Sequence, residues 1–360
     1  MTRNINILNL SNIKINLLDL NRDEINQFIS SLGAKSFSTI QIMKWIYDYH
    51  CTDFSKMSNI SKILRYQLEK KSYIFAPSFT QENISHDGTI KWITSLGNDY
   101  IETVYIPEKK RSTLCISSQI GCALNCDFCA TGKIGFKRNL TVSEIIAQIW
   151  QANKILKKKN INQSITNVVF MGMGEPLLNL RNVVSAIKII LDEYAFKLSK
   201  RRITVSTSGI VPALNKLINM TDICLAISLH APNDTIRNNI MPINQKYNIQ
   251  SLLDAVLKYL KQSHANHGGV TIEYVMLNGI NDSKKNAEEL AILLHNIPSK
   301  INLIPWNPFF NSRFSCSTHD NIHCFARLLR RKGFTTIIRK NRGDDINAAC
   351  GQLIGSYIKK

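Results

Sequence analysis

The chain has 360 residues, with 45 Lys and Arg against 26 Asp and Glu and a formal net charge of +19. This length suits one large core with a small accessory domain. The positive charge favours a nucleic-acid partner. The alternative explanation for the charge is compositional drift, because the chain is rich in Lys, Ile and Asn. The nine cysteines, odd in number and partly clustered, argue against a secreted disulfide framework, and no signal peptide or membrane-length apolar run is seen, so we expect a cytoplasmic protein without a membrane partner.

Residues 1–80 have the pattern of a small helical domain. Apolar residues recur at helical spacing in Ile40–Tyr47 and again in Ile60–Leu68. Basic residues lie on the same helices. We therefore expect a helical accessory domain at residues 1–80 that takes part in nucleic-acid binding.

A β-hairpin is predicted next, at residues 81–110. A linker at Phe75–Ser78 precedes two strands, Thr89–Ser95 and Tyr100–Ile106. Between the strands stands Leu-Gly-Asn-Asp, which has the composition of a tight turn. We interpret this hairpin as an extension that links the accessory domain to the core.

After Pro107, strands alternate with helices, which predicts a parallel sheet covered by helices. The expected strands are Ser112–Ser117, Asn167–Met171, Arg202–Ser206, Ile223–Ser228, Gly269–Val275 and Ile301–Pro305. The expected helices are Val142–Lys157, Leu180–Asp192, Ile210–Leu217, Ile249–Ser263, Ser283–Asn296 and Thr318–Arg331. Six units are too few for a closed eight-fold barrel, so the predicted fold class is α/β, a partial (β/α)6 barrel at residues 111–310. In such sheets the active site lies at the carboxyl ends of the strands.

Three cysteines follow the first of these strands at close spacing. Cys122, Cys126 and Cys129 form a C-x3-C-x2-C run on one short loop. Three soft thiolates suit a [4Fe–4S] cluster and leave one iron without a protein ligand, so that iron can hold a substrate. The alternative is a structural zinc site closed by a fourth ligand, for which Cys115 is the candidate.

Small and polar residues stand at the ends of the later strands. They are Gly174 and Glu175 in Gly172–Pro176, then Ser206, Ser228, Leu229, His230 and Asn307. Glycine lets the backbone approach a ligand closely, and the Glu175 carboxylate can accept hydrogen bonds from an ammonium group. Each residue could also be an ordinary cap or loop residue, but their shared location favours a binding site. His230 is not expected to ligate a metal, because no partner ligand follows at helical spacing.

Residues 311–360 are predicted to contain a helix and a reactive C-terminal segment. Arg339, Lys340 and Arg342 could bind phosphates, and Asp344 and Asp345 could cap a helix that carries Cys350. A single cysteine near a C-terminus is usually a small buried apolar residue.

Together these motifs resemble the RlmN/Cfr family of radical S-adenosylmethionine (SAM) RNA methyltransferases. The matching stretches are Gly88–Trp92, Ile101–Pro107, Thr113–Cys122, Gly172–Asn179, Val205–Gly209, Ile304–Pro308 and Arg342–Gln352. They span roughly residues 88–353, whereas residues 1–80 match only as a small basic helical domain.

The resemblance implies a role for each candidate residue. Cys122, Cys126 and Cys129 resemble the ligands of the [4Fe–4S] cluster, and the strand-end set resembles the SAM contacts: Gly174, Glu175, Ser206, Ser228, Leu229, His230 and Asn307. Three catalytic residues are implied, namely Cys350 as the cysteine that becomes methylated, Cys115 as its partner thiol and Glu102 as the proton acceptor. Without the resemblance, we would interpret Glu102 as an exposed strand residue. Cys51, Cys224, Cys316 and Cys324 receive no role beyond packing.

The implied reaction is methylation of adenine C2 in 23S rRNA and tRNA, through a methylated Cys350 and with two SAM molecules per turnover. A monomer that receives electrons from a flavodoxin is the expected form. Two alternatives stay open: a sister activity at adenine C8 of rRNA, and a zinc-containing RNA-binding protein without catalysis. The form Gly-Glu-Pro-Leu-Leu-Asn at residues 174–179 favours the C2 activity.

Overall fold

A computed structural model describes residues 14–159, 161 and 164–354. Residues 1–13 of the predicted accessory domain and residues 355–360 of the C-terminal segment lie outside the described residues. None of the helices in these ranges is both long enough and apolar enough to cross a membrane.

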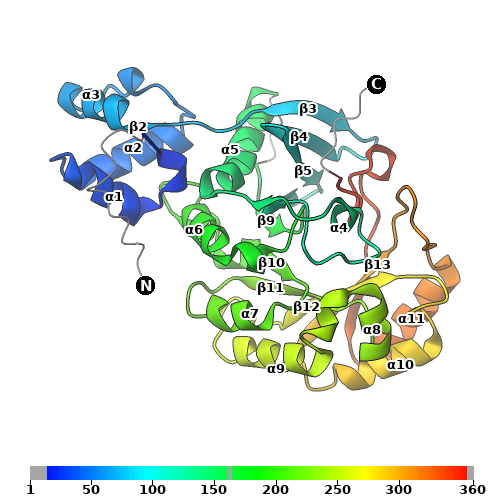
Figure 1. The fold of residues 1–360 in the computed structure, drawn as a ribbon. Coiled ribbons are helices and arrows are strands. Elements are labelled where there is room, and N and C mark those ends of the chain that lie inside the picture. Colours follow the sequence, from blue (N-terminus) through cyan, green and yellow to red (C-terminus); the bar gives the residue numbers. More distant parts are fainter. Residues whose placement is uncertain (1–13, 160, 162–163, 355–360) are drawn as a thin grey trace.

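The N-terminal unit is a small bundle of three helices, shown in blue in Figure 1. Its helices are α1 (Arg22–Ser31), α2 (Phe37–Tyr47) and α3 (Lys62–Lys71), with short 3-10 turns at Leu17–Asp19 and Phe54–Lys56. The strands β1 (Ile15–Asn16) and β2 (Ser72–Tyr73) pair in parallel and bring the two ends of the unit together. The helices predicted here from the apolar spacing are α2 and α3.

The N-terminal unit is anchored on the core through helix α5 (Val142–Lys158). The Trp150 indole N–H donates to the Ile46 carbonyl at 2.8 Å, and the Ser143 amide donates to the Asp19 carboxylate at 2.7 Å. Thr141 and Glu144 form a capping box that fixes the start of α5. The long amphipathic helix α5 therefore serves both the bundle and the sheet.

The core is one ten-stranded sheet in the order β14-β13-β12-β11-β10-β9-β6-β5-β4-β3. Six strands in parallel and in chain order carry the predicted βα units: β6 (Ser112–Cys115), β9 (Asn167–Phe170), β10 (Ile203–Thr207), β11 (Cys224–Ser228), β12 (Val270–Met276) and β13 (Ser299–Pro305). Because β6 and β13 do not pair with each other, the barrel is partial, and the predicted fold class is confirmed.

The sheet has one strand more than predicted at each of its two edges. The hairpin strands β4 (Ile90–Leu96) and β5 (Asp99–Pro107) are joined by β3 (Phe79–Ile84), and β14 (Thr335–Ile338) adds a further parallel strand beyond β13. Sequence reasoning missed β3 because Phe-Thr-Gln-Glu-Asn-Ile is mostly polar, as suits an edge strand. The hairpin continues the same sheet as the six parallel strands.

Helices cover the sheet and the strand ends (Figure 1). Besides α5 they are α4 (Ala130–Ile134), α6 (Leu180–Leu191), α7 (Val211–Leu217), α8 (Asp234–Ile240), α9 (Ile249–Leu260), α10 (Lys284–Leu293) and α11 (His319–Arg331), and 3-10 turns lie at Pro176–Asn179, Lys200–Arg202, Pro242–Gln245 and Asp344–Ile346. The small helices α4 and α8 were not predicted. Both follow strand ends, where they are placed to support the site.

Candidate active site

A two-stranded ribbon holds the loop that carries the three clustered cysteines. Strand β7 (Gln119–Ile120) pairs with β8 (Arg138–Asn139), so the two ends of the loop are pinned together. Gly121 has a φ of 69°, and a Cβ there would lie 1.7 Å from the Gly135 carbonyl oxygen. Only glycine fits this close crossing, which fixes the start of the cysteine run.

Cys126 is buried, Cys122 and Cys129 are partly buried, and all three thiols are free in this structure. Burial raises the pKa of Cys122 to about 12, and it also raises those of Cys126 and Cys129. The Cys129 thiol adds to the pKa shifts of Cys122 and Cys126, and the Cys122 thiol adds to that of Cys126. Free thiols in such a place stay protonated, whereas iron would draw off the protons and bind the thiolates. The donor set is soft and gathered on one loop, and it therefore fits an iron–sulfur cluster.

The geometry disfavours the zinc alternative. A structural zinc site needs four ligands, and Cys115 was the candidate for the fourth. The electrostatic neighbours of Cys115 are Cys350 and Arg339 rather than the clustered cysteines. Cys115 is therefore not placed as a fourth ligand.

Glu175 is buried beside the stem of the cysteine loop. Its carboxylate accepts hydrogen bonds from the amides of Ser208 at 2.8 Å and Leu177 at 3.0 Å, and its own amide donates to the Gln119 side chain at 2.8 Å. Burial raises its pKa, and these amide donors oppose the shift. Gly174 has a φ of 95°, and a Cβ there would meet the Gln119 Cβ at 2.5 Å, so this segment presses directly on the loop stem.

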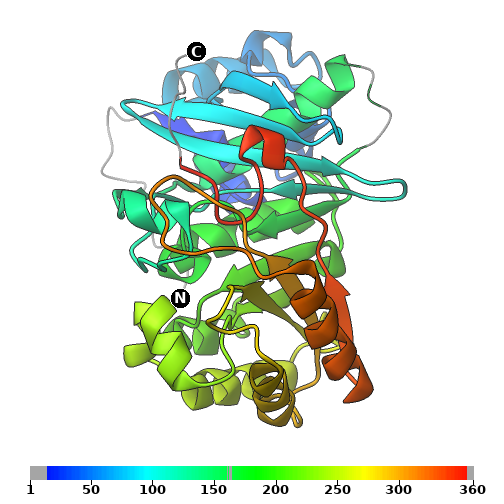
Figure 2. The same ribbon diagram turned by 90° about the vertical axis from the view of Figure 1, so that its right-hand side faces the viewer.

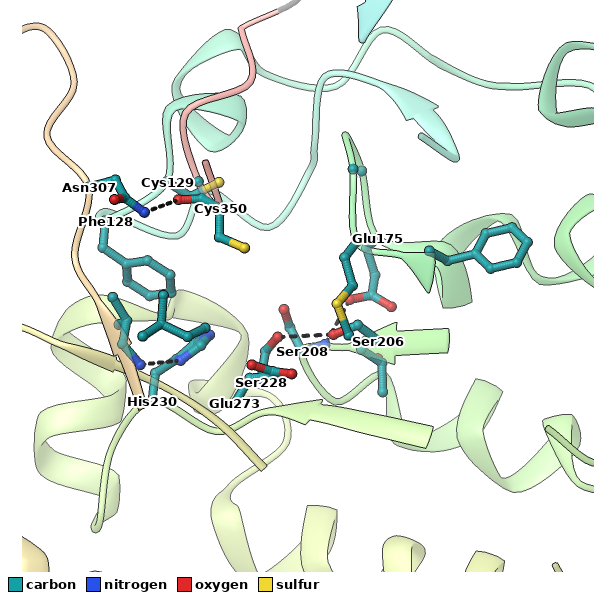
Figure 3. Close-up of a pocket in the computed structure, with 18 of the residues that line it drawn as sticks. Phe128, Cys129, Glu175, Ser206, Ser208, Ser228, His230, Glu273, Asn307 and Cys350 are labelled. Atoms are coloured by element: carbon teal, nitrogen blue, oxygen red, sulfur yellow. Dashed lines mark hydrogen bonds between the residues drawn. The ribbon is translucent and has the colours of Figure 1, made fainter. Parts of the chain in front are cut away.

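A cavity of about 150 Å³ opens at the carboxyl ends of the parallel strands (Figure 3). Six of the seven strand-end residues predicted to contact SAM line it: Gly174, Glu175, Ser206, Ser228, His230 and Asn307. Cys129 and Cys350 lie together at one end in Figure 3, and Ser206, Ser228 and Glu273 lie at the other. The cavity therefore has Cys129, the last of the clustered cysteines, and Cys350 at the same end.

Leu229 is the exception among the predicted contacts. Its side chain is buried and does not line the cavity, while its carbonyl accepts from Arg237 at 3.0 Å. His230 lies in the left-handed region with a φ of 60°, and its Nδ1 accepts from the Val275 amide at 3.0 Å. Burial lowers the pKa of His230 to about 3, so the imidazole is neutral, and in contact with Phe128 it forms a wall of the cavity.

Sequence reasoning missed a buried cation that ties the strand ends together. The Arg237 guanidinium, on α8, is fully buried and donates to three carbonyls: Leu229 at 3.0 Å, Ser208 at 2.7 Å and Ser228 at 3.2 Å. Burial lowers its pKa to about 10. The last carbonyl of α8, that of Ile240, accepts from the Asp127 amide at 3.0 Å in the cysteine loop. Helix α8 thus connects the ends of β10 and β11 to that loop.

Replacing Arg237 by methionine should strongly destabilise the fold, because three carbonyls at the buried or partly buried strand ends would lose the guanidinium donor. We expect a loss of about 3 kcal/mol or more in the free energy of unfolding, measured by urea titration. The control is Arg201→Met, at an exposed arginine, with an expected change within about 0.5 kcal/mol. Equal stability of the two variants would contradict this role for Arg237.

Arg339 and Arg342 are placed differently from the prediction. Arg339 lines the cavity, with its Nη1 3.6 Å from Glu273 Oε2, and Arg342 Nη1 lies 3.5 Å from the Asp87 carboxylate. Both guanidiniums are thus engaged in internal ion pairs, so the prediction that they are phosphate ligands finds no support in these contacts. Glu273 was not singled out, although a lone carboxylate in the apolar strand β12 was the available signal.

Cys350 lies in a turn and not on the predicted helix. Only a 3-10 turn forms at Asp344–Ile346, and Asn347 ends it in the left-handed region with a φ of 51°. The Asn307 side-chain Nδ2 donates to the Cys350 carbonyl at 3.2 Å, and the Ala130 backbone amide donates to the Gly351 carbonyl at 2.7 Å. The exposed Cys350 is thus held against the cysteine loop, and Figure 2 shows this red segment passing beside the cyan hairpin strands.

Cys115 and Glu102 complete the predicted set. Burial raises the pKa of Cys115 to about 12, nearby Cys350 adds to the shift, and the Arg339 cation opposes it. Glu102 is 1% exposed, so its interpretation as an exposed strand residue was wrong. Both faces of β5 are covered, and the alternation of its sequence cannot reveal this.

Known proteins resemble this chain along its full length. Residues 15–74 match the ribosomal RNA large subunit methyltransferase N-terminal domain, and residues 116–291 match the radical SAM superfamily. The dual-specificity RNA methyltransferase RlmN of Buchnera aphidicola subsp. Acyrthosiphon pisum (strain APS) is 68% identical over 363 residues, covering 100% of both chains. That of Buchnera aphidicola subsp. Schizaphis graminum (strain Sg) is 68% identical over 360 residues, covering 100% of this chain and 99% of the other.

A solved structure has the same fold. It is a radical SAM methyltransferase from Sphaerobacter thermophilus, with a TM-score of 0.88 and 37% identity, and the match covers 95% of this chain and 100% of that one. The clustered cysteines and the cavity at the strand ends are consistent with the radical SAM superfamily, to which these relatives also point. The chain belongs to the RlmN family of dual-specificity RNA methyltransferases, within the radical SAM superfamily.

Proposed function

We propose that this protein methylates C2 of adenine in 23S rRNA and tRNA, with Cys350 as an intermediate carrier of the methyl group. The observation that carries the proposal is the meeting of Cys350 with Cys129 of the three-cysteine loop at one cavity, where Cys350 also has Cys115 as an electrostatic neighbour. The named relatives support the RNA substrate and its dual range. We also infer a cytoplasmic monomer that receives electrons from a flavodoxin.

The low electron density of adenine C2 requires that a residue of the protein carry the methyl group. This carbon lies between two ring nitrogens and is electron-poor, so it cannot attack the methyl carbon of SAM. A thiolate can, because sulfur is a good nucleophile. Cys350 is exposed at the mouth of the cavity, where both a methyl donor and a base can reach it.

The chain's residues would hold the cofactors as follows. Cys122, Cys126 and Cys129 hold the [4Fe–4S] cluster, while Gly174, Glu175, Ser206, Ser228, His230 and Asn307 surround SAM and Leu229 contributes its backbone. When bound, the cluster and SAM supply the one-electron chemistry that activates the methyl group on Cys350. The buried Glu175 carboxylate is suited to the SAM ammonium group, and the neutral His230 closes the cavity wall.

The remaining steps belong to three side chains. For the bond between the Cys350 methyl carbon and C2 to form, the methyl group must lose a hydrogen atom and C2 must lose a proton and an electron. The hydrogen atom and the electron would pass to the bound SAM and cluster, and the Glu102 carboxylate accepts the C2 proton. Cys115, as a thiolate, then attacks the Cys350 sulfur. The S–C bond breaks with its electron pair on carbon, that carbon takes a proton, and the Cys115–Cys350 disulfide forms. All nine cysteines, each within the described residues, are free in this structure.

Analysis of modified nucleosides tests the proposal. RNA from cells with and without this protein would be digested and examined by mass spectrometry. We expect 2-methyladenosine in rRNA and tRNA only when the protein is present. Formation of 8-methyladenosine instead would identify the sister activity, and unmodified RNA would overturn the assignment.

The N-terminal unit offers a surface suited to RNA. Helix α3 exposes Ile63 (75%) and Tyr66 (61%), and Lys70 Nζ lies 5.5 Å from the centre of the Tyr66 ring. Ile63, Tyr66 and Lys70 are spaced so that they share one helix face. An aromatic ring beside a cation can stack on a base and meet a phosphate at once.

Changing this face should weaken RNA binding without affecting SAM binding. We expect Tyr66→Ala to lower RNA affinity by roughly tenfold. In a plot of log affinity against log salt concentration, Lys70→Glu should make the slope shallower by about one unit or more. The matched control is Tyr247→Ala, since Tyr247 also lies beside a lysine, with Lys246 Nζ 5.6 Å from its ring centre. Fluorescence anisotropy with labelled RNA measures both effects, and equal losses at Tyr66 and Tyr247 would argue against the α3 surface.

A further inference from the structure

A buried ion pair connects the hairpin to the segment that carries Cys350. Lys91 Nζ on β4 lies 3.7 Å from Glu102 Oε1 on β5, and the two side chains are 2% and 1% exposed. The same Lys91 ammonium donates a hydrogen bond to the Asn347 carbonyl at 3.1 Å. Asn347 precedes Cys350 by three residues. One cation thus contacts both the proposed proton acceptor and the backbone that leads to the methyl carrier.

The register of the strands places this pair on the same face of the sheet as Cys115. Lys91 lies opposite Val104, and Val104 lies opposite Cys115, so these three side chains share a face. Glu102 is two residues from Val104 and shares it too. Thr103 points the other way and donates to a side chain of α5 at 2.9 Å. Glu102 and Cys115 are diagonal neighbours, at roughly 7 Å.

Stability does not account for a buried ammonium and carboxylate. Removing both ions from water is costly, and apolar residues of similar size often serve a fold equally well. Burial lowers the pKa of Lys91, and Glu102 opposes that shift. Without a cation nearby, a carboxyl group buried to this degree would favour its protonated form, which cannot accept a proton.

Other contacts hold the Cys350 segment independently of Lys91. The Asp345 carboxylate accepts from the Ser85 hydroxyl at 2.6 Å and from the His86 amide at 3.2 Å. The Asn307 side-chain Nδ2 donates to the Cys350 carbonyl at 3.2 Å. Loss of the Lys91 ammonium therefore leaves the segment docked and changes chiefly Glu102 and the Asn347 carbonyl.

We propose that Lys91 is a positioning residue that keeps Glu102 as a carboxylate and fixes Cys350 beside it through the Asn347 carbonyl. The inference rests on the proposed function. The proton that leaves C2 goes to Glu102, the electron pair of the C–H bond stays in the adenine ring, and Lys91 keeps its own protons. Removing Lys91 should therefore stop the reaction after the bond to RNA has formed and before the product is released.

The experiment compares Lys91→Met with the wild-type protein, both carrying the cluster. In the first turnover with RNA present, we expect the variant to cleave SAM to 5′-deoxyadenosine in an amount within about twofold of wild type. The amount of methylated RNA should nevertheless be lower by about tenfold or more. Protein that carries covalently bound RNA should accumulate on a denaturing gel. Lys91→Arg, which keeps the cation, should recover part of the product.

A control substitution at the end of helix α5 removes a different ion pair, one made to strand β3 of the same sheet. Lys159 Nζ lies 2.5 Å from Glu82 Oε1, and Glu82 pairs with Trp92, whose side chain faces away from that of Lys91. Lys159→Met should give wild-type product and no RNA-linked protein. If Lys91→Met does not fold, the double variant Lys91→Met/Glu102→Gln removes both charges, and it should match Glu102→Gln alone because the two residues act together.

Three results would overturn the inference. The first is wild-type product from Lys91→Met, the second is loss of product without RNA-linked protein, and the third is a double variant far less active than Glu102→Gln. Each leaves the proposed function standing as long as the wild-type chain makes 2-methyladenosine. A wild-type chain that methylates no RNA would overturn the function and, with it, this inference.

Discussion

Replacing Cys115 by alanine is expected to trap the enzyme on its RNA. In the proposed reaction the Cys350 sulfur is joined through one carbon to adenine C2, and this bond is stable until a second thiol attacks that sulfur. Cys115 interacts electrostatically with Cys350, as does Cys129, which the proposal assigns to the cluster. The variant should still bind SAM, because the residues lining the cavity are unchanged. Product should fall by at least about a hundredfold, since water replaces a thiolate poorly.

Denaturing gel electrophoresis with labelled RNA measures the trapped species. Cys115→Ala should carry RNA that survives denaturation, whereas Cys115→Ala/Cys350→Ala should not, because no methyl carrier is left. Cys224→Ala is the matched control, since Cys224 is a partly buried thiol on β11 whose sulfur contacts the Arg201 and Ala265 carbonyls. Normal release of product from Cys115→Ala would overturn the roles of both cysteines.

Replacing Cys126 by alanine is expected to abolish both the cluster and all turnover. Cys126 is the most buried of the three clustered thiols and interacts electrostatically with both of the others. In a [4Fe–4S] site with three protein ligands, losing one leaves two irons unprotected. Activity should fall below detection, because the one-electron chemistry depends on the cluster.

Iron and sulfide content after anaerobic reconstitution is the measurement, together with the visible absorption of the protein. Cys122→Ala and Cys129→Ala should behave like Cys126→Ala. Cys316→Ala, at an exposed cysteine outside the loop, should take up the cluster as the wild type does. Near-complete cluster content in Cys126→Ala would contradict the assigned ligand set.

Several features of this protein followed from local sequence alone. The spacing of Cys122, Cys126 and Cys129 placed three thiols on one loop, and the structure confirms that the loop closes at the ribbon β7–β8. The alternation of strands and helices predicted the partial barrel, which is confirmed. Strand-end residues such as Glu175 and Ser228 converge because the carboxyl ends of parallel strands meet at one edge. These properties depend on short-range periodicity, which a sequence displays directly.

Other features were decided only by contacts between distant segments. Lys91 and Asn347 are 256 residues apart, and nothing local to either predicts their hydrogen bond. Glu102 belongs to a strand whose two faces are both covered, so its alternation could not show that the carboxylate is buried. Arg339 carries a charge that suits phosphate, but the tertiary structure turns it toward Glu273.

The same reason explains the placement of Cys350. Its segment has too little regular periodicity to show its conformation, and the predicted helix is replaced by a turn held by Asn307 and Ala130. Residue type thus determined which chemistry the chain can perform: thiolates for iron and methyl transfer, and a carboxylate for a proton. Strand register and long-range hydrogen bonds determined which of these groups face one another, because partners far apart in the chain are fixed only when the sheet assembles.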